Sequence, residues 1–118
     1  MATVRADGAP VTVACWYEYL HDGRVLLSMS DRARRLDHLH GNPHVALTVL
    51  GDDWYHHVSL LGRVSETRTD DGLVDLDRLS MRYLGNPYAD REPCVTVIVL
   101  VDRWHTYGSP ASDTEPGG

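Results

Sequence analysis

The stretch from Arg24 to Leu50 constrains the fold more than any other part of the chain. It begins with an apolar run, RVLLSMS, that is typical of a strand. It continues with DRARRLDHLH, whose apolar spacing predicts a short helix. Gly41 and Pro43 then end the helix, and the apolar run HVALTVL predicts another strand. The stretch therefore predicts two strands joined by one short helix.

Three arginines, Arg32, Arg34 and Arg35, stand near the start of this predicted helix. We expect the helix to run from Asp31 to His40, with Ser30 as its N-cap. A helix N-terminus adds free N–H donors and a partial positive charge, so arginines there are well placed to meet a phosphate or a carboxylate. A solvated helix face explains the same spacing equally well, and the pattern leaves both interpretations open.

The composition limits the class of protein. The 118 residues suit one domain, which we expect to span residues 1–108. The tail at 109–118 is rich in Pro, Gly, Ser and acidic residues, and this composition predicts disorder. A net charge of −6 argues against nucleic acid as the main partner, because phosphate backbones are bound by broad basic surfaces. No apolar run reaches the roughly 20 residues that span a bilayer.

Cysteine and histidine usage favours a reduced, cytoplasmic protein without a metal site. Cys15 and Cys94 are too few for a disulfide framework, and the N-terminus has no signal-peptide character. None of the seven histidines has a partner at a spacing that predicts a ligand set. No nucleophile motif, P-loop or dinucleotide-binding turn is present. Catalytic residues therefore remain unassigned, and the chemistry of an enzyme of this kind belongs to a cofactor.

Short strands dominate the whole chain. The predicted strands are Ala2–Arg5, Val11–Tyr19, Arg24–Ser28, His44–Leu50, Tyr55 to about Ser65, Cys94–Val101 and a short one at 104–107. Leucines at helical spacing predict a second helix between Thr69 and Gly85. Six or seven short, mostly antiparallel strands with two helices predict a mainly β (α+β) domain that closes into a small barrel, since closure removes unpaired edges.

The run from Cys94 to Val101 is almost wholly apolar, which indicates a strand covered on both faces. A barrel this small hides only one face of a strand. We therefore expect a second copy of the chain to cover the other face, in a homodimer whose interface exceeds roughly 2,000 Å².

Trp16 lies in the second predicted strand, close to the arginine-bearing segment. An indole at such a place can flank a planar ring system. It is more often a large core residue, and the sequence favours the core position.

Several pieces of the chain, taken in order, match those of a known family: ATVRADGAP, CWYEY, DGRVLLSMSDRARRLDHL, NPHVALTVL, GRV at 62–64, RYLGNPY and RWHTYG. Together they cover residues 2–108, and although each piece is weak alone, the ordered set is specific. The chain resembles the pyridoxamine 5′-phosphate oxidase-like split-barrel flavoproteins. It is most similar to the actinobacterial branch that depends on coenzyme F420, a deazaflavin.

The resemblance implies an antiparallel, six-stranded split β-barrel with two short helices, forming a homodimer with the cofactor in a groove between subunits. It places the cofactor phosphate after the third strand. The positions that match on this chain, with Trp16 beside the ring, are Ser28, Ser30, Arg32, Arg34, Arg35 and His38. Relatives carry basic residues where this chain has Asp31 and Asp37, and two carboxylates near a phosphate weaken its binding.

The function that the resemblance implies is an F420- or FMN-dependent oxidoreductase, with F420 favoured. It transfers a hydride between the reduced cofactor and a small conjugated substrate. An alternative from another class is a non-catalytic protein of the same fold that sequesters a flavin, haem or tetrapyrrole, which Asp31 and Asp37 favour slightly. A third is a structural dimer with an empty groove.

Overall fold

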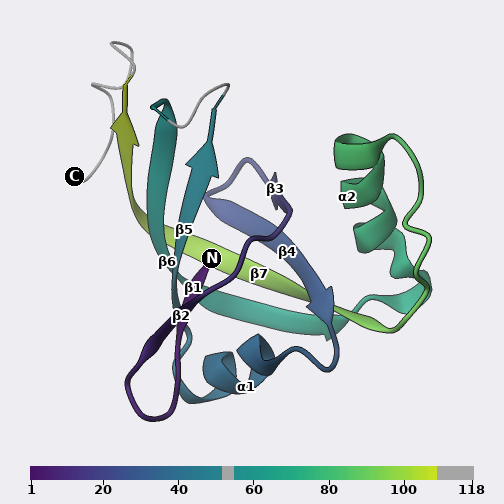
Figure 1. Ribbon diagram of the computed structural model, residues 1–118, viewed down its shortest axis with the longest axis horizontal. Coiled ribbons are helices and arrows are strands. Elements are labelled where there is room, and N and C mark those ends of the chain that lie inside the picture. Colours follow the sequence, from purple (N-terminus) through teal and green to yellow (C-terminus); the bar gives the residue numbers. More distant parts are fainter. Residues whose placement is uncertain (52–54, 109–118) are drawn as a thin grey trace.

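The computed structural model describes residues 1–51 and 55–108, and the tail predicted at 109–118 lies outside these residues. The strands are β1 (Ala2–Val4), β2 (Pro10–Thr12), β3 (Tyr17–Tyr19), β4 (Arg24–Ser30), β5 (His44–Leu50), β6 (His57–Thr69) and β7 (Cys94–Tyr107) (Figure 1). The helices are α1 (Arg34–Gly41) and α2 (Val74–Leu84), with a 3-10 turn, η1 (Asp71–Leu73), leading into α2.

All of these strands join one antiparallel sheet in the order β2-β1-β5-β6-β7-β4-β3. The antiparallel, mainly β class is therefore confirmed. The closed barrel that the strand pattern predicts and the six strands that the resemblance implies are both wrong, because the described residues form seven strands in an open sheet. The segment expected as one strand at Val11–Tyr19 explains the difference. Residues 13–16 leave the strand conformation, so β2 and β3 lie at opposite edges of the sheet.

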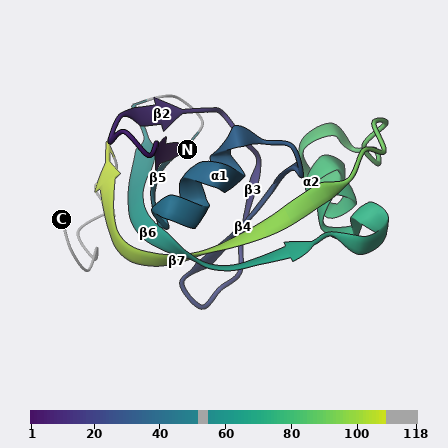
Figure 2. The same ribbon diagram turned by 90° about the horizontal axis from the view of Figure 1, so that it is seen from below.

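The long strands β6 and β7 curve the sheet around an interior (Figure 2). Their register shifts at Leu61/Gly62 and Val64/Glu66, and bulges of this kind bend and twist a strand. Gly62 stands where β7 comes very close, because an added Cβ would lie 2.5 Å from the carbonyl oxygen of Leu100. Residues 104–107, expected as a separate strand, continue β7.

The main core fills the concave side of the sheet. Its buried members are Val25, Leu27, Met29, Leu39, Val45, Leu47, Val97 and Val99. Leu39 comes from α1, which lies inside the curve of the sheet (Figure 2). Full burial of a side chain of this size stabilises the fold by about 1.5–3 kcal/mol, so this cluster holds α1 firmly against the sheet.

The other face of β7 is covered by α2 of the same chain. Leu79 of α2 packs there against Leu26 of β4 and Ile98 of β7, all three buried. As the sequence predicts, β7 is apolar on both faces because other parts of the protein pack against both faces. The inference that its second face needs a partner subunit is wrong, because α2 supplies that cover.

Both helices begin later than the sequence predicts. Ser30 does not cap α1, because its Oγ accepts the backbone N–H of Arg32 at 3.2 Å and residues 31–33 form a turn. Asp70 caps α2, since its carboxylate accepts the N–H groups of Asp75 at 3.1 Å and Leu76 at 2.9 Å. Among the described residues, no helix has the length and apolarity needed to cross a membrane.

Candidate functional site

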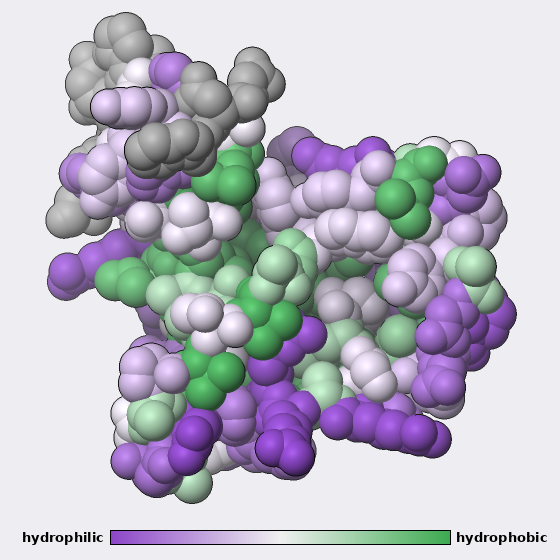
Figure 3. All heavy atoms as spheres, viewed as in Figure 1, coloured by the Kyte–Doolittle hydropathy of each residue, from purple (hydrophilic) through white to green (hydrophobic). Residues whose placement is uncertain are grey.

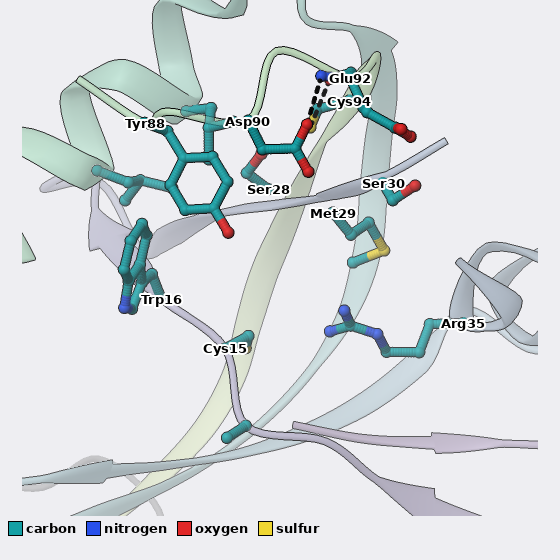
Figure 4. Close-up of a pocket in the computed structure, with 13 residues that line it drawn as sticks. Cys15, Trp16, Ser28, Met29, Ser30, Arg35, Tyr88, Asp90, Glu92 and Cys94 are labelled. Carbon is teal, nitrogen blue, oxygen red and sulfur yellow. Dashed lines mark hydrogen bonds between the residues drawn. The ribbon is translucent and has the colours of Figure 1, made fainter. Parts of the chain in front are cut away.

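A pocket of about 460 Å³ lies beside the end of β4, where several parts of the chain meet (Figure 4). We call it the ring pocket. Its lining residues are Ala14, Cys15, Trp16, Ser28, Met29, Ser30, Arg35, Leu76, Leu79, Tyr88, Asp90, Glu92 and Cys94. They come from the segment between β2 and β3, from β4, from both helices, and from the loop that enters β7. Four of the predicted site residues, Trp16, Ser28, Ser30 and Arg35, therefore do come together.

Two hydroxyls and one guanidinium form the polar end of the ring pocket. The Ser28 Oγ is shut off from solvent and makes no hydrogen bond of normal geometry among the described residues, although it lies close enough to the Cys94 thiol to lower the pKa of that thiol. Arg35 extends from α1 into the pocket (Figure 4), and its Nη1 lies 3.8 Å from the Met1 sulfur. A buried hydroxyl without a partner is costly, so Ser28 fits a pocket whose occupant supplies the missing hydrogen bond.

A second cavity, of about 760 Å³, lies on the other side of Arg35. We call it the basic pocket. Its lining residues are Arg5, Val11, Val13, Ala33, Arg34, Arg35 and His38. Arg35 lines both pockets, so the predicted residues divide around it. Arg34 and His38 belong to the basic pocket, and Arg32 is exposed and lines neither.

The arginines at the start of α1 differ from most others in the chain. In the described part of the chain, carboxylates pair with Arg5, Arg24, Arg63, Arg68, Arg78 and Arg91. Arg32, Arg34 and Arg35 form no such pair within residues 1–51 and 55–108. Arginines without a carboxylate partner leave their N–H donors available for an anionic ligand.

His38 has a structural contact that the sequence does not reveal. Its Nδ1 lies 2.9 Å from the Oγ1 of Thr3, which is 1% exposed. This hydrogen bond ties α1 to β1 and fixes the ring at the edge of the basic pocket.

An aromatic wall closes one side of the ring pocket. The Trp16 ring stacks on Tyr83 at a centroid distance of 5.2 Å and an interplanar angle of 5°. Tyr88 meets Trp16 edge-on, at 5.7 Å and 88°. Trp16 also packs against the Leu26, Leu79 and Ile98 cluster, so it has both the core role and a place in the pocket.

The loop between α2 and β7 places two acidic residues on the far side of the ring pocket. Asp90 and Glu92 lie across the cavity from Arg35 (Figure 4). Burial raises the pKa of the Cys94 thiol and outweighs the nearby Ser28 hydroxyl, which lowers that pKa, while the charges of Asp70, Asp31 and Asp90 raise it further. Cys94 is thus a neutral thiol in a region of negative potential, and a poor nucleophile.

Sequence reasoning missed Tyr88, Asp90 and Glu92 as lining residues. They follow the Gly85 that ends α2, in a stretch that the sequence marks only as a loop. The piece RYLGNPY, which carries part of the resemblance, ends at Tyr88 and was the one available signal.

Comparisons with known proteins agree with this architecture. The family model for pyridoxamine 5′-phosphate oxidase matches residues 1–106. A solved structure described as an F420 reductase is 25% identical, with a TM-score of 0.76, and the match covers 87% of this chain and 84% of that one. No curated protein sequence matches the chain.

Two further structures share the fold at lower identity. A conserved hypothetical protein from Mycobacterium tuberculosis is 23% identical, with a TM-score of 0.64 over 99% of this chain and 80% of that one. General Stress Protein 26 from Bacillus anthracis is 17% identical, with a TM-score of 0.64 over 90% and 80%. Because the family model spans nearly all of the described residues, the chain belongs to the pyridoxamine 5′-phosphate oxidase family, a family of flavin-type oxidoreductases.

Proposed function

We propose that the protein is an oxidoreductase that uses coenzyme F420 and holds it in the ring pocket. The observation that carries this proposal is Arg35, which lacks a carboxylate partner among the described residues and lines the same pocket as the Ser28 hydroxyl and the Trp16 ring. Cation, buried hydroxyl and indole are the three kinds of group that a phosphorylated ring cofactor needs. Family membership and the F420 reductase among the similar structures support it.

The residues of the pocket fit such a cofactor. Ser28, Ser30 and Arg35 would hold its phosphate, and Trp16 would lie beside its ring. Leu76 and Leu79 of α2 make that part of the wall apolar and exclude water from it. The bound cofactor supplies the hydride chemistry, and the protein's contribution is binding and orientation.

The basic pocket favours F420 over FMN. F420 carries carboxylates beyond its phosphate, whereas the side chain of FMN ends at its phosphate. A pocket that continues past Arg35 to Arg34 and Arg5 offers cations to the longer anionic chain. Arg5 already pairs with Asp7, so Arg34 is the stronger candidate of the two.

A second copy of the chain completes the proposal. On the face seen in Figure 3, apolar side chains gather over β1 and β2, close to the basic pocket. Val13, at 38% exposure, lies at this surface beside residues 14–16 of the ring pocket. A homodimer formed here would cover these side chains and place both pockets beside the subunit interface.

Parallel titrations with F420 and FMN test the cofactor assignment. We expect F420 to bind more tightly than FMN, and the loaded, reduced protein to pass a hydride to a small conjugated acceptor. Tight FMN binding with no binding of F420 would overturn the cofactor assignment. Tight binding of haem or another tetrapyrrole without turnover would favour the sequestering alternative.

A further inference from the structure

The segment that carries Trp16 has little regular structure of its own. Residues 13–16 leave the strand conformation, and β3 begins only at Tyr17. Trp16 nevertheless lines the ring pocket, where it is half-buried (Figure 4). Because no strand pairing fixes this part of the backbone, the position of the indole depends on the side chains that pack against it.

One side of α2 grips the residues that follow Trp16. Arg78 holds the Glu18 carboxylate through two nitrogens, at 2.9 Å from Nε and 2.7 Å from Nη2. Four positions along the helix, the guanidinium carbon of Arg82 lies 5.8 Å from the centre of the Tyr17 ring. Residues four apart share one side of a helix, so both contacts come from the same side of α2. They hold the start of β3 against that helix.

Tyr83, the next residue of α2, extends this grip to the indole itself. Its ring stacks on Trp16 with a centroid distance of 5.2 Å and an interplanar angle of 5°. Its hydroxyl accepts the Tyr17 N–H and donates to the Tyr17 carbonyl, both at 3.4 Å. Stacked aromatic pairs are favourable beyond the area they bury, so the Tyr83 ring fixes the plane of the indole.

Tyr83 acts on the ring pocket only through Trp16. The described lining of the pocket includes Trp16 and Tyr88 but not Tyr83. The Tyr83 side chain is 41% exposed, whereas Leu79 of the same helix is buried and supplies the core contact. The fold therefore depends mainly on Leu79, and the stack affects chiefly the place of the indole.

We infer that Tyr83 is a positioning residue that holds the Trp16 indole as a fixed wall for the planar ring of the ligand. The inference deepens the proposed function and rests on it, because that ring belongs to the proposed cofactor. Without the Tyr83 ring, the indole turns into the vacated space and the wall recedes. The ring end of the ligand then loses contact, while the phosphate end keeps Arg35, which lies on α1.

Fluorescence from a single indole tests the position of Trp16 directly. The chain has three tryptophans, so Trp54→Phe with Trp104→Phe leaves Trp16 as the only one. In this background, Tyr83→Leu should raise the acrylamide quenching constant about twofold, because the indole loses its stacking partner. Tyr83→Phe keeps the ring and should leave the constant nearly unchanged. Met81→Ala, at an exposed residue of the same helix, serves as the matched control.

Ligands with and without a ring show what the wall does. In Tyr83→Leu, the affinity for F420 should fall about threefold to tenfold. The affinity for glycerol 3-phosphate, which has a phosphate but no ring, should not change in an NMR titration. Tyr83→Phe should bind both ligands as the natural protein does. Tyr83→Gln provides a second variant without the ring, with a polar side chain suited to an exposed helix position.

The quenching measurement needs no cofactor, so this inference and the proposed function fail separately. A raised constant in Tyr83→Leu with no binding of F420 or FMN by the natural protein would refute the oxidoreductase proposal and leave Tyr83 as the residue that positions Trp16. An unchanged constant in the variants without the ring, or an equal rise in Met81→Ala, would overturn the inference. Unchanged F420 affinity in Tyr83→Leu, or an equal loss for glycerol 3-phosphate, would overturn it too.

Discussion

Arg35 is the residue at which the two pockets meet. Arg35 lies in the first turn of α1 and extends between Met1 and the end of β4. It has no carboxylate partner among the described residues. Its neighbour Asp31 is exposed and carries the opposite charge. The affinity for an anionic cofactor thus depends on the balance between a few charges around the end of β4.

Replacing Asp31 by Arg should tighten F420 binding. The change removes a repulsive charge and adds an attractive one near the phosphate, and because the site is exposed we expect only about a threefold to tenfold gain. Fluorescence titration at two salt concentrations measures it, and the gain should shrink as salt rises. Neither aspartate lines a pocket, but Asp31 directly follows Ser30 at the end of β4, whereas Asp37 lies farther along α1, so the same charge change in Asp37→Arg should have a smaller effect. Equal gains in both variants would place the phosphate away from Asp31.

The positions of Ser28, Ser30 and Arg35 in one pocket could be predicted from sequence, because a strand that runs into a helix brings its last residues and the first helical turn together. The exposed position of Arg32 could not be predicted, since it depends on the turn at 31–33 that delays α1. The bond between His38 and Thr3 could not be predicted either, because it joins elements that are far apart in the chain.

Among the elements, α2 has the largest effect on the site. It covers the outer face of β4 and β7, and it gives the ring pocket Leu76 and Leu79. Asp75 anchors it to the sheet, accepting hydrogen bonds from Thr96 of β7 at 2.7 Å and from Arg68 of β6 at 3.2 Å. The sequence shows the leucines of α2 clearly. It does not show which face of the sheet they cover, and this is why it suggested a partner subunit for β7.

The Asp75 anchor should make stability depend on pH in the acid range. Burial alone would raise the pKa of Asp75, but the hydrogen bonds from Thr96 and Arg68 and the charges of Arg68 and Arg78 outweigh it and lower that pKa. A lowered pKa gives stability that is present above the unfolded value of about 4 and is lost as the pH falls through the folded value.

Urea unfolding of Asp75→Asn measures this contribution. At pH 7 we expect a loss of about 1–3 kcal/mol, because Thr96 and Arg68 lose a charged partner. The difference from the natural protein should narrow as the pH falls below about 4. Asp22→Asn, which removes an exposed pair with Arg24, should cost at most about 1 kcal/mol. A difference for Asp75→Asn that stays constant down to pH 3 would contradict the account.

At the scale of the whole molecule, the open sheet leaves apolar surface near both pockets. The sequence predicts a barrel because short antiparallel strands favour closure, but the break at residues 13–16 separates β2 from β3. The same break carries Cys15 and Trp16 to the wall of the ring pocket. The irregular segment at residues 13–16, which the sequence pattern does not reveal, thus also contributes residues to the site.

We expect the protein to be a dimer of its 13.2 kDa chain at micromolar concentration. Light scattering measures the mass directly. Val13→Glu should shift it toward the monomer, since it places a charge on the apolar surface over β1 and β2. Leu84→Glu changes an exposed residue of α2, at 57% exposure, and should leave the mass unchanged. A monomer mass for the natural protein would refute the homodimer and with it the proposal that both pockets lie beside a subunit interface.

The affinity of Arg35→Ala for F420 tests the central claim most directly. Removing this guanidinium should cost about 1.5–3 kcal/mol, or roughly 10- to 150-fold in affinity, because a charge-assisted hydrogen bond to the phosphate is lost. Arg103→Ala, at an exposed arginine that lines neither pocket, serves as the matched control and should bind F420 as the natural protein does. Circular dichroism confirms that both variants are folded. An unchanged affinity in a folded Arg35→Ala protein would show that the cofactor phosphate does not bind at the junction of β4 and α1.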